Sequence, residues 1–489
     1  MINSSYSKRG WLVNAWRAGL LAIFCGVFTT SANAIDDISE RLVLNCTNQL
    51  KGTFTDSTLD VVRGGKYPLP KTGGFRVSSA ERFWLTPGLA PYCLVKGTIL
   101  PTSPNGKDPA VKSPDYIVPD INYQIYIPSQ WNGKLIQLGG GGFAWSADVM
   151  SSVLLPTTQF STSLANYALL ISDAGVSDMA KVFTPDFVQA GNKISDIPQQ
   201  EMVKNFGQDS IKKSLDVALH VTTTLAGKKP ADIYFVGLST GGRQALKAMA
   251  NWPDSYDGVI SGAPPAYETE LLRGFVIPSV YDSIIANYNK PIDAFKVLYG
   301  VDLSTESMRE FLKGVSTTLT TAAVMSGEAN DSYNKILNVL MPVWNVTPSD
   351  LSKYLDATEL LKRTGNKGKK IILYQGTSDY LVNCRQSGRF VRELAEVAQS
   401  KNMTPDSIRN SVRTFFVEDY SHGFYTATST PKTGGVWLNM QLMWGAISEL
   451  DNWVHNGNAS VQGPLLSRNP SGAIPSVQDL SSWNCLATP

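Results

Sequence analysis

The sequence predicts an α/β fold with a mostly parallel sheet and one mostly helical insertion. Three observations support this fold class. Short apolar runs rich in β-branched and aromatic residues alternate with helical patterns along much of the chain. One such run, Ile233–Val236, leads directly into a glycine-rich turn and a helix-prone segment beginning at Arg243. Between about residues 266 and 368, the pattern is instead helical and lacks strand-like runs.

The composition is that of a globular protein and argues against a nucleic-acid partner. Of the 489 residues, 43% are hydrophobic and 17% are charged, and the net charge of +2 is spread along the chain without a basic stripe. The length suits one large domain with one insertion.

Residues 1–34 have the pattern of an export signal. Three basic residues precede an apolar run of about eleven residues, and Ala32–Ala34 supplies a small-x-small cleavage site. The run is too short to span a bilayer, which requires about 20 helical residues. We therefore expect a secreted or periplasmic mature chain from about Ile35, with no membrane partner. Phe24 is a poor residue before a lipidated cysteine, so lipid anchoring at Cys25 is the less favoured interpretation.

The mature chain contains four cysteines: Cys46, Cys93, Cys384 and Cys485. An even number in an exported chain predicts two disulfides. Four cysteines permit three pairings, and the sequence alone does not choose among them. We favour Cys46–Cys93, which leaves Cys384–Cys485. Scattered cysteines and only three histidines do not indicate a zinc site, so we assign no metal and no cofactor.

The elements follow in order along the chain. Residues 35 to about 115 combine short strand-like runs with Pro- and Gly-rich turns, and are interpreted as a β-rich segment that decorates the core. An amphipathic helix is predicted at Gln200–Ala226. The predicted core strands are Ile121–Ile127, Lys134–Leu138, Tyr167–Asp173, Ile233–Val236, Tyr256–Pro265 with its turn, Lys370–Tyr374 and Arg413–Val417. Helices are predicted in the insertion, for example at Ser304–Val315 and Ser332–Met341. The main domain is thus predicted to comprise residues 35–265 and 369–489, interrupted by a lid at 266–368.

The turn after Ile233–Val236 has the sequence Gly-Leu-Ser-Thr-Gly, which fits the pattern G-x-S-x-G. A side chain at Gly237 or Gly241 would collide with its neighbours in so tight a turn, and the turn lifts the Ser239 hydroxyl clear of the sheet. The alternative is a glycine-rich turn that merely closes a βα unit. Because a strand precedes the pattern and a helix follows it, we predict a nucleophile elbow. The fold class is accordingly an α/β-hydrolase fold with a mostly helical inserted lid domain.

A serine nucleophile needs a histidine base, and the chain has three histidines. His220 falls in a helix before the elbow, and His455 lies in a polar stretch after the last predicted core helix. Structural or solvated roles are expected for both. His422 lies in a loop just after a strand and before Gly423, where an α/β-hydrolase places its base.

The carboxylate is assigned to Asp379, which also follows a predicted strand. It lies between the serine and the histidine in the chain, the order expected of this fold. Asp173 precedes the nucleophile and Asp419 shares a loop with His422, so both fit less well. Asp379 would hold the His422 tautomer and stabilise the imidazolium.

Four glycines at 139–142 follow a predicted strand. Without side chains, such residues let backbone N–H groups approach a ligand closely and supply an oxyanion donor; a flexible loop is the alternative.

These residues resemble the tannase/feruloyl esterase family, which includes the enzyme that hydrolyses mono(hydroxyethyl) terephthalate. The matching segments are Val236–Gln244, Tyr256–Pro264, Trp131–Lys134 before the four glycines, Ile372–Gly376 before Asp379, and the Cys46/Cys93 pair. The resemblance covers nearly all of the mature chain outside the lid. It implies carboxylic ester hydrolysis through Ser239, Asp379 and His422, with oxyanion donors from the backbone N–H groups of Gly142 and Thr240.

The sequence departs from the family pattern at two points. The family usually has a cysteine beside the catalytic serine and another beside the histidine, joined as a disulfide, whereas Leu238 and Ser421 stand here. The triad chemistry does not depend on that bridge, because neither sulfur transfers a proton. The lid also lacks a D-x-D-x-N-type calcium loop, so no lid calcium is expected.

The leading hypothesis is a secreted serine carboxylic-ester hydrolase acting on aromatic esters, such as gallates, hydroxycinnamates or related compounds. Its partner would be a small-molecule ester. The alternatives are a polyester-fragment hydrolase or peptidase on the same scaffold, and a binding protein with a vestigial site. The filled triad positions disfavour the last of these.

Overall fold

The computed structural model describes residues 45–83, 91–102, 118–141, 165–175, 193, 200–275, 330–363, 368–376, 379, 382–417 and 435–457. The predicted export signal, much of the insertion, and the segment containing His422 lie outside these residues. Within the described ranges, no helix is long and apolar enough to cross a membrane.

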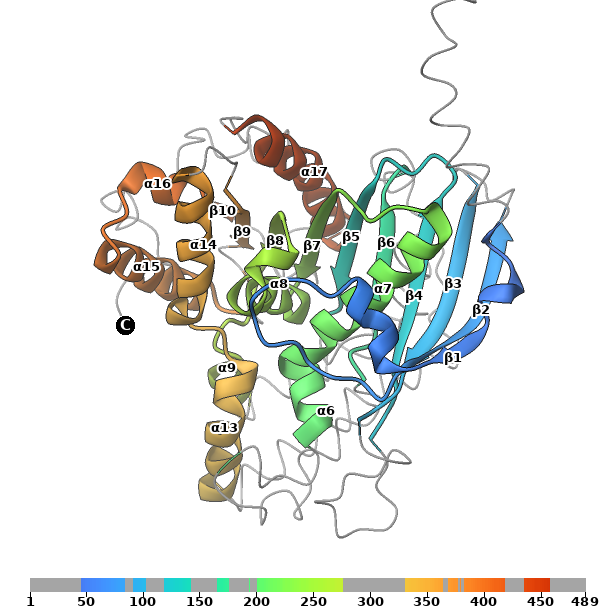
Figure 1. The fold of residues 1–489 in the computed structure, drawn as a ribbon. Helices are drawn as coiled ribbons and strands as arrows, with labels where there is room; N and C mark the ends of the chain where they lie inside the picture. Colours follow the sequence, from blue (N-terminus) through green and yellow to red (C-terminus); the bar gives the residue numbers. More distant parts are fainter. Residues whose placement is uncertain are drawn as a thin grey trace, which may run out of the picture.

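A ten-stranded mixed sheet runs through the described part of the chain (Figure 1). Its strands are β1 (Gly52–Phe54), β2 (Phe75–Phe83), β3 (Tyr92–Ile99), β4 (Ile121–Pro128), β5 (Lys134–Gly139), β6 (Ala168–Ser172), β7 (Asp232–Leu238), β8 (Gly258–Gly262), β9 (Lys370–Gly376) and β10 (Val412–Val417). Their order is β1-β2-β3-β4-β6-β5-β7-β8-β9-β10. The strands from β6 to the β10 edge are parallel, whereas β1 to β4 and the β4–β6 pair are antiparallel.

Helices connect the strands and cover the sheet. They are α6 (Gln200–Lys204), the π-helix η6 (Asn205–Asp209), α7 (Ser210–Ala226), α8 (Thr240–Asn251), α9 (Glu268–Phe275), α13 (Asn330–Trp344), α14 (Ser352–Arg363), α15 (Cys384–Ser400), α16 (Pro405–Arg409) and α17 (Gly435–Asn456). The described residues also include four short 3₁₀ helices: η1 (Asn48–Leu50), η2 (Asp56–Val61), η7 (Pro253–Ser255) and η8 (Pro348–Leu351).

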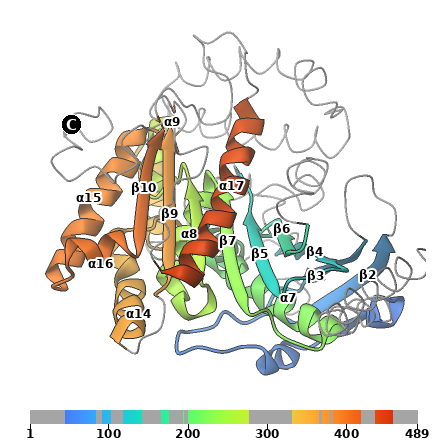
Figure 2. The same cartoon turned by 90° about the horizontal axis from the view of Figure 1, so that it is seen from above.

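Both faces of the parallel strands are covered, which explains their continuous apolar runs. Every residue of β8 and β9 is buried. Adjacent β9 residues belong to opposite layers: Leu373 packs with the cluster that includes α7 and α8, and Ile372 packs with the cluster on α17. Figures 1 and 2 show α7 and α8 on one side of the sheet and α17 on the other. This three-layer arrangement confirms the predicted α/β-hydrolase fold class.

The N-terminal strands do not decorate the core as predicted. Instead, β3 pairs with β4 along its whole length, and β2 pairs with β3, so both extend the main sheet. Apolar and polar residues are mixed in the β2 sequence because its buried and exposed residues largely alternate, as in a sheet with one solvated face.

The predicted helix at Gln200–Ala226 is interrupted by the π-helix Asn205–Asp209. Gly207 of this π-helix lies against α13: a Cβ atom there would come within 2.5 Å of the Val343 Cγ1 atom.

The predicted insertion helix at Ser332–Met341 falls within α13, whereas Ser304–Val315 lies outside the described residues. Leu355 of α14 packs in the same cluster as α7 and α8, so this helix joins the core layer.

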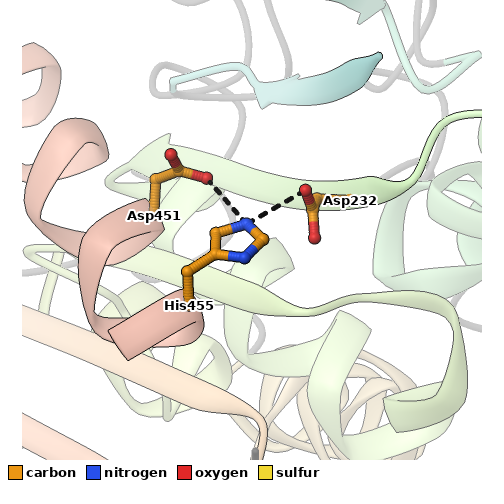
Figure 3. A group of neighbouring side chains, drawn as sticks. All are labelled: Asp232, Asp451 and His455. Atoms are coloured by element: carbon orange, nitrogen blue, oxygen red, sulfur yellow. Dashed lines mark hydrogen bonds and ion pairs between the residues drawn. The ribbon is translucent and has the colours of Figure 1, made fainter. Parts of the chain in front are cut away.

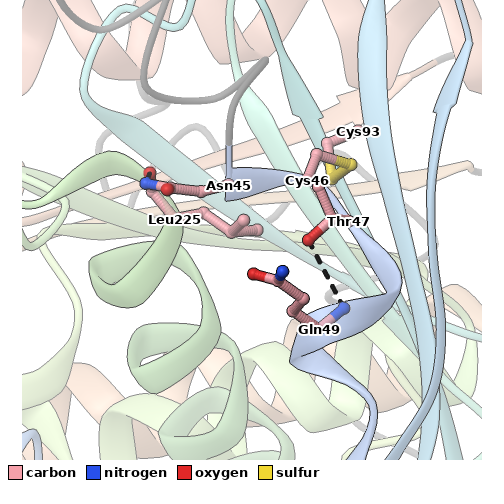
Figure 4. Close-up of a disulfide and its surroundings, with 6 residues drawn as sticks. All are labelled: Asn45, Cys46, Thr47, Gln49, Cys93 and Leu225. Atoms are coloured by element: carbon pink, nitrogen blue, oxygen red, sulfur yellow. Dashed lines mark hydrogen bonds between the residues drawn. A yellow bond between two sulfur atoms is a disulfide. The ribbon is translucent and has the colours of Figure 1, made fainter.

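The preferred disulfide, Cys46–Cys93, is present and attaches the N-terminal segment to β3 (Figure 4). Its cysteines are 47 residues apart in sequence. In the chain-entropy picture, closing a loop of this size stabilises the fold by about 4 kcal/mol. The neighbouring Asn45 donates a side-chain hydrogen bond of 3.1 Å to the Leu225 carbonyl of α7.

Cys384 at the start of α15 is also disulfide-bonded. Its pairing with Cys485 stays a prediction, because Cys485 lies outside the described residues.

We expect the mature protein to contain no free thiol, because four cysteines remain after removal of an export signal. Titration of the denatured, unreduced protein should give about zero thiols per chain, and the reduced control should give about four. A value of about two in the unreduced sample would show that one predicted bridge does not form.

Candidate active site

The carboxyl ends of the central parallel strands meet at one edge of the sheet. Gly139 of β5 is paired with Gly237 of β7, and Leu238 is paired with Gly262 of β8. Farther along, Gly376 of β9 is paired with Val417 of β10. In open α/β sheets, ligands bind at this edge. The predicted nucleophile follows one of these strand ends.

Ser239 occupies a strained turn between β7 and α8. Its backbone has φ +60° and ψ −125°, a conformation that non-glycine residues rarely adopt. Such strain costs about 1–3 kcal/mol and persists only where the surroundings enforce it. Here the Ser239 N–H donates to the Gly262 carbonyl at 2.8 Å, and the Ser239 carbonyl accepts from the Arg243 N–H at 3.0 Å. The strand, strained serine and helix form the predicted nucleophile elbow.

The glycines around Ser239 are required by close backbone packing. A Cβ atom on Gly237 would lie 2.3 Å from the Gly241 carbonyl carbon. A Cβ atom on Gly241 would lie 2.5 Å from the Gly139 carbonyl oxygen, and one on Gly242 would lie 2.3 Å from the Gly262 oxygen. The end of β5, the elbow and the end of β8 are therefore in backbone contact.

The same packing brings the start of the four-glycine run close to the start of α8. Thr240 is the buried first residue of α8, so the positive end of this helix dipole lies next to Ser239. Gly139 packs against the elbow and begins the four-glycine run. Positive backbone dipoles at this position suit a developing oxyanion. Gly142 itself lies outside the described residues.

Asp379 lies just beyond β9 and is 6% exposed. Its Oδ1 accepts a hydrogen bond from the Val382 N–H at 2.8 Å, and its Oδ2 accepts one from Gln375 Nε2 at 2.9 Å. Ser387 of α15 in turn donates to the Gln375 side chain at 2.8 Å. The carboxylate is thus fixed by β9 and α15. Two strand spacings separate β9 from β7, a lateral distance of about 10 Å that leaves room for an intervening imidazole.

Asp173, one competing carboxylate, has a structural role. It follows β6, and its Oδ1 accepts hydrogen bonds of 2.9 Å from the Asn122 and Gly175 N–H groups. Burial raises the pKa of Asp173, and hydrogen bonds from Asn122 and Gly175 oppose this increase. Its contacts fasten the end of β6 to β4. The other competitor, Asp419, lies outside the described residues.

Two of the three histidines are placed far from the elbow. The His220 ring lies 5.5 Å from the Phe75 ring at the β2 side of the sheet, and burial lowers its pKa. His455 Nε2 on α17 lies 3.1 Å from Asp232 Oδ2 (Figure 3). Asp232 begins the seven-residue strand that ends beside Ser239, so this contact is about 23 Å from Ser239. His422 lies outside the described residues.

Asp232, Asp451 and His455 form a cluster that the sequence analysis missed. Their ligand atoms lie within 4.8 Å of one another, close enough to hold a metal ion. However, Lys134 Nζ lies 2.6 Å from both carboxylate oxygens of Asp451, and Tyr234 donates to Asp451 at 2.6 Å. The Lys134 ammonium group therefore already supplies a positive charge beside the carboxylates. The cluster connects α17 to the start of β5 and β7 through hydrogen bonds and ion pairs. Asp451 and His455 are one helical turn apart, but Asp232 is far from both in the sequence, so no sequence motif reveals the cluster.

Comparison with known proteins gives matches to esterases. Residues 109–269 match the family model for tannase and feruloyl esterase. An uncharacterized esterase of Agrobacterium fabrum is 33% identical over 212 residues, covering 41% of this chain and 33% of that protein. A probable feruloyl esterase of Arthroderma benhamiae is 32% identical over 161 residues, covering 33% of this chain and 28% of that protein. The matches span a third or less of these relatives' length.

Among solved structures, a tannin acyl hydrolase from Aspergillus niger aligns with a TM-score of 0.48 and 14% sequence identity. The alignment covers 83% of this chain and 87% of that chain.

We expect Gly237→Ala to destabilise the protein, because the added methyl group would overlap the Gly241 backbone. Overpacking of this kind costs about 1–3 kcal/mol, and thermal unfolding followed by circular dichroism would measure it. Gly64→Ala is the matched control, since a Cβ atom there has open space around it. Equal melting temperatures for the two variants would contradict the packing argument.

Proposed function

We propose that the chain is a member of the tannase and feruloyl esterase family, whose model matches residues 109–269, and that it hydrolyses carboxylic esters with Ser239, His422 and Asp379 as its triad. The observation that carries the proposal is the strained Ser239 backbone between β7 and α8. This conformation is costly and is enforced by glycine contacts on both sides. A nucleophile elbow uses such a turn to make the serine hydroxyl project from the sheet.

In the proposed mechanism, His422 removes the Ser239 proton as the hydroxyl oxygen attacks the ester carbonyl carbon. The N–H groups of Thr240 and Gly142 stabilise the resulting oxyanion. His422 then protonates the departing alcohol, leaving an acyl-Ser239 intermediate. In the second half of the cycle, His422 activates a water molecule that releases the acid. Asp379 orients the imidazole throughout.

Three observations support the assignment of the base and acid. His220 and His455 are engaged elsewhere, which leaves His422 as the histidine able to serve the elbow. β10 lies beside β9, so the chain leaves the sheet at Val417 next to the β9 end that precedes Asp379. The Asp379 carboxylate is already oriented by Val382 and Gln375. Each contact reduces the reorganisation needed to hold a protonated imidazole.

The missing cysteine bridge beside the triad does not weaken this proposal. Leu238 packs against the apolar cluster that includes α17, while its backbone pairs with Gly262. Sheet pairing and apolar packing therefore hold the residue before the nucleophile.

For the substrate, we propose an aromatic carboxylic ester such as a hydroxycinnamate or a gallate. The support is the family match together with the probable feruloyl esterase among the relatives. The residues that act on the ester carbonyl cannot distinguish acyl groups, so recognition falls to the insertion, which leaves the core after β8 and returns before β9. We further propose export of the mature chain, on the basis of the pattern in residues 1–34.

We expect Ser239→Ala to abolish hydrolysis of p-nitrophenyl acetate and methyl ferulate while leaving circular dichroism unchanged. Loss of a triad serine can reduce turnover by about 10⁶-fold. His422→Gln should approach this loss, and Asp379→Asn should lose about 10⁴-fold by favouring the wrong tautomer.

His455→Gln is the matched control and should retain activity. Undiminished turnover in Ser239→Ala would exclude the proposed nucleophile. If Asp419→Asn proved damaging and Asp379→Asn did not, the carboxylate would be reassigned.

The insertion is expected to determine which acyl groups of the substrate are preferred. Replacing residues 270–343 with a Gly/Ser linker should reduce kcat/KM for methyl ferulate at least about tenfold more than for p-nitrophenyl acetate, equivalent to about 1.4 kcal/mol of transition-state binding. The linker would join two chain ends that are already hydrogen-bonded between Ala266 and Val346. Equal losses for a folded protein would show that the insertion provides general stability instead.

A further inference from the structure

The two ends of the insertion are joined at one buried point. The Val346 N–H donates to the Ala266 carbonyl at 2.7 Å. The Thr269 N–H donates to Asn345 Oδ1 at 3.0 Å, and Asn345 Nδ2 donates to Thr269 Oγ1 at 3.0 Å. We call residues 266–269 and 344–346 the insertion root. These bonds close the insertion on itself, so its placement depends on what holds the root.

Two buried cations of α8 hold the root. Arg243 Nη1 donates to the Trp344 carbonyl at 3.0 Å, and Lys247 Nζ donates to the Asn345 carbonyl at 2.7 Å. Arg243 and Lys247 are four residues apart and therefore share one face of α8. Because α13 ends at Trp344, both cations lie at the negative end of its dipole, where positive charge is favourable.

Arg243 also binds the other half of the root and a third element. Its Nε lies 3.1 Å from Glu268 Oε2, and both residues are buried, Arg243 completely. Its remaining nitrogens donate to the Gly207 carbonyl at 2.9 Å and the Phe206 carbonyl at 3.3 Å, both on the π-helix. A planar guanidinium can reach these three elements at once, whereas an ammonium group cannot.

The connection from this network to the nucleophile is short. Arg243 lies in the first turn of α8, and its N–H donates to the Ser239 carbonyl. Burying an ion pair brings little net stability compared with apolar packing of similar volume, but it fixes the geometry of the partners. Positioning is therefore the better account of a fully buried arginine one turn from the nucleophile.

We propose that Arg243 and Glu268 are positioning residues that fix the insertion root on the first turn of α8 and so set the insertion's place relative to Ser239. This inference rests on the proposed ester hydrolysis, because it concerns how a bulky acyl group is placed against the nucleophile. A small acyl group makes few contacts beyond the elbow and should depend little on the root.

The test compares Arg243→Lys and Glu268→Gln with wild type on methyl ferulate and p-nitrophenyl acetate. Rates are expressed per active serine, counted by titration with a phosphonate, so that unfolded protein does not enter the comparison. A displacement of about 1 Å can cost about 10²-fold. We therefore expect the ratio of the two kcat/KM values to fall about ten- to a hundredfold in Arg243→Lys, mainly through KM for the ferulate.

A surface pair between α14 and the end of α15 supplies the matched controls. Lys401 Nζ lies 2.7 Å from Asp356 Oδ1, and the Asp356 side chain is exposed. Lys401→Arg and Asp356→Asn should leave the ratio unchanged. Equal losses on both esters in Arg243→Lys and Glu268→Gln, or no loss, would overturn the positioning role.

Hydrogen exchange separates this inference from the proposed function. If wild type hydrolyses neither ester, the proposed function fails, but the root can still be examined through the Thr269 and Val346 amides. Faster exchange of both amides is expected in Arg243→Lys, without change in Lys401→Arg. Unchanged exchange would overturn the inference whatever the activity.

Discussion

Backbone contact around Ser239 is the constraint on which the rest of the structure depends. The end of β5, the elbow and the end of β8 approach so closely that Gly139, Gly237 and Gly241 have no room for a Cβ atom. This contact forces the serine into a strained conformation whose cost, about 1–3 kcal/mol, must be met by the surrounding sheet. The parallel strands, buried on both faces, supply that rigidity. The same sheet places β9, the strand before Asp379. Helix α8 places the insertion root.

Much of the fold could be predicted because its signals are local. Parallel strands buried on both faces leave continuous apolar runs, as at Lys370–Tyr374. The π-helix at Asn205–Asp209 could not be predicted, because no local pattern shows that its Gly207 packs against α13, a helix far away in sequence. Likewise, nothing local in Tyr92–Val95 shows that the strand pairs with β4. Antiparallel pairing depends on a partner that pattern analysis does not identify.

The candidate site divides in the same way. The Ser239 turn could be predicted because five consecutive residues define it, whereas the role of Asp379, inferred from strand order, stays a prediction. The buried Arg243–Glu268 pair joins residues that individually look like ordinary helix-surface charges. Only the approach of α9 to α8 shows that they meet in a buried position. Long-range polar pairs of this kind require the structure.

The register of β2 has a consequence for solubility. Among the described residues, β1 covers β2 only from Phe75 to Val77, leaving its later residues paired on one side with β3. An uncovered strand edge can recruit strands from other molecules. Here the register shifts between Val77 and Ser79, and the charged residues Glu81 and Arg82 follow. Irregularity and charge both oppose edge-to-edge association. Apolar substitutions at Glu81 or Arg82 would therefore cause aggregation in concentrated protein while leaving the structure around Ser239 unchanged.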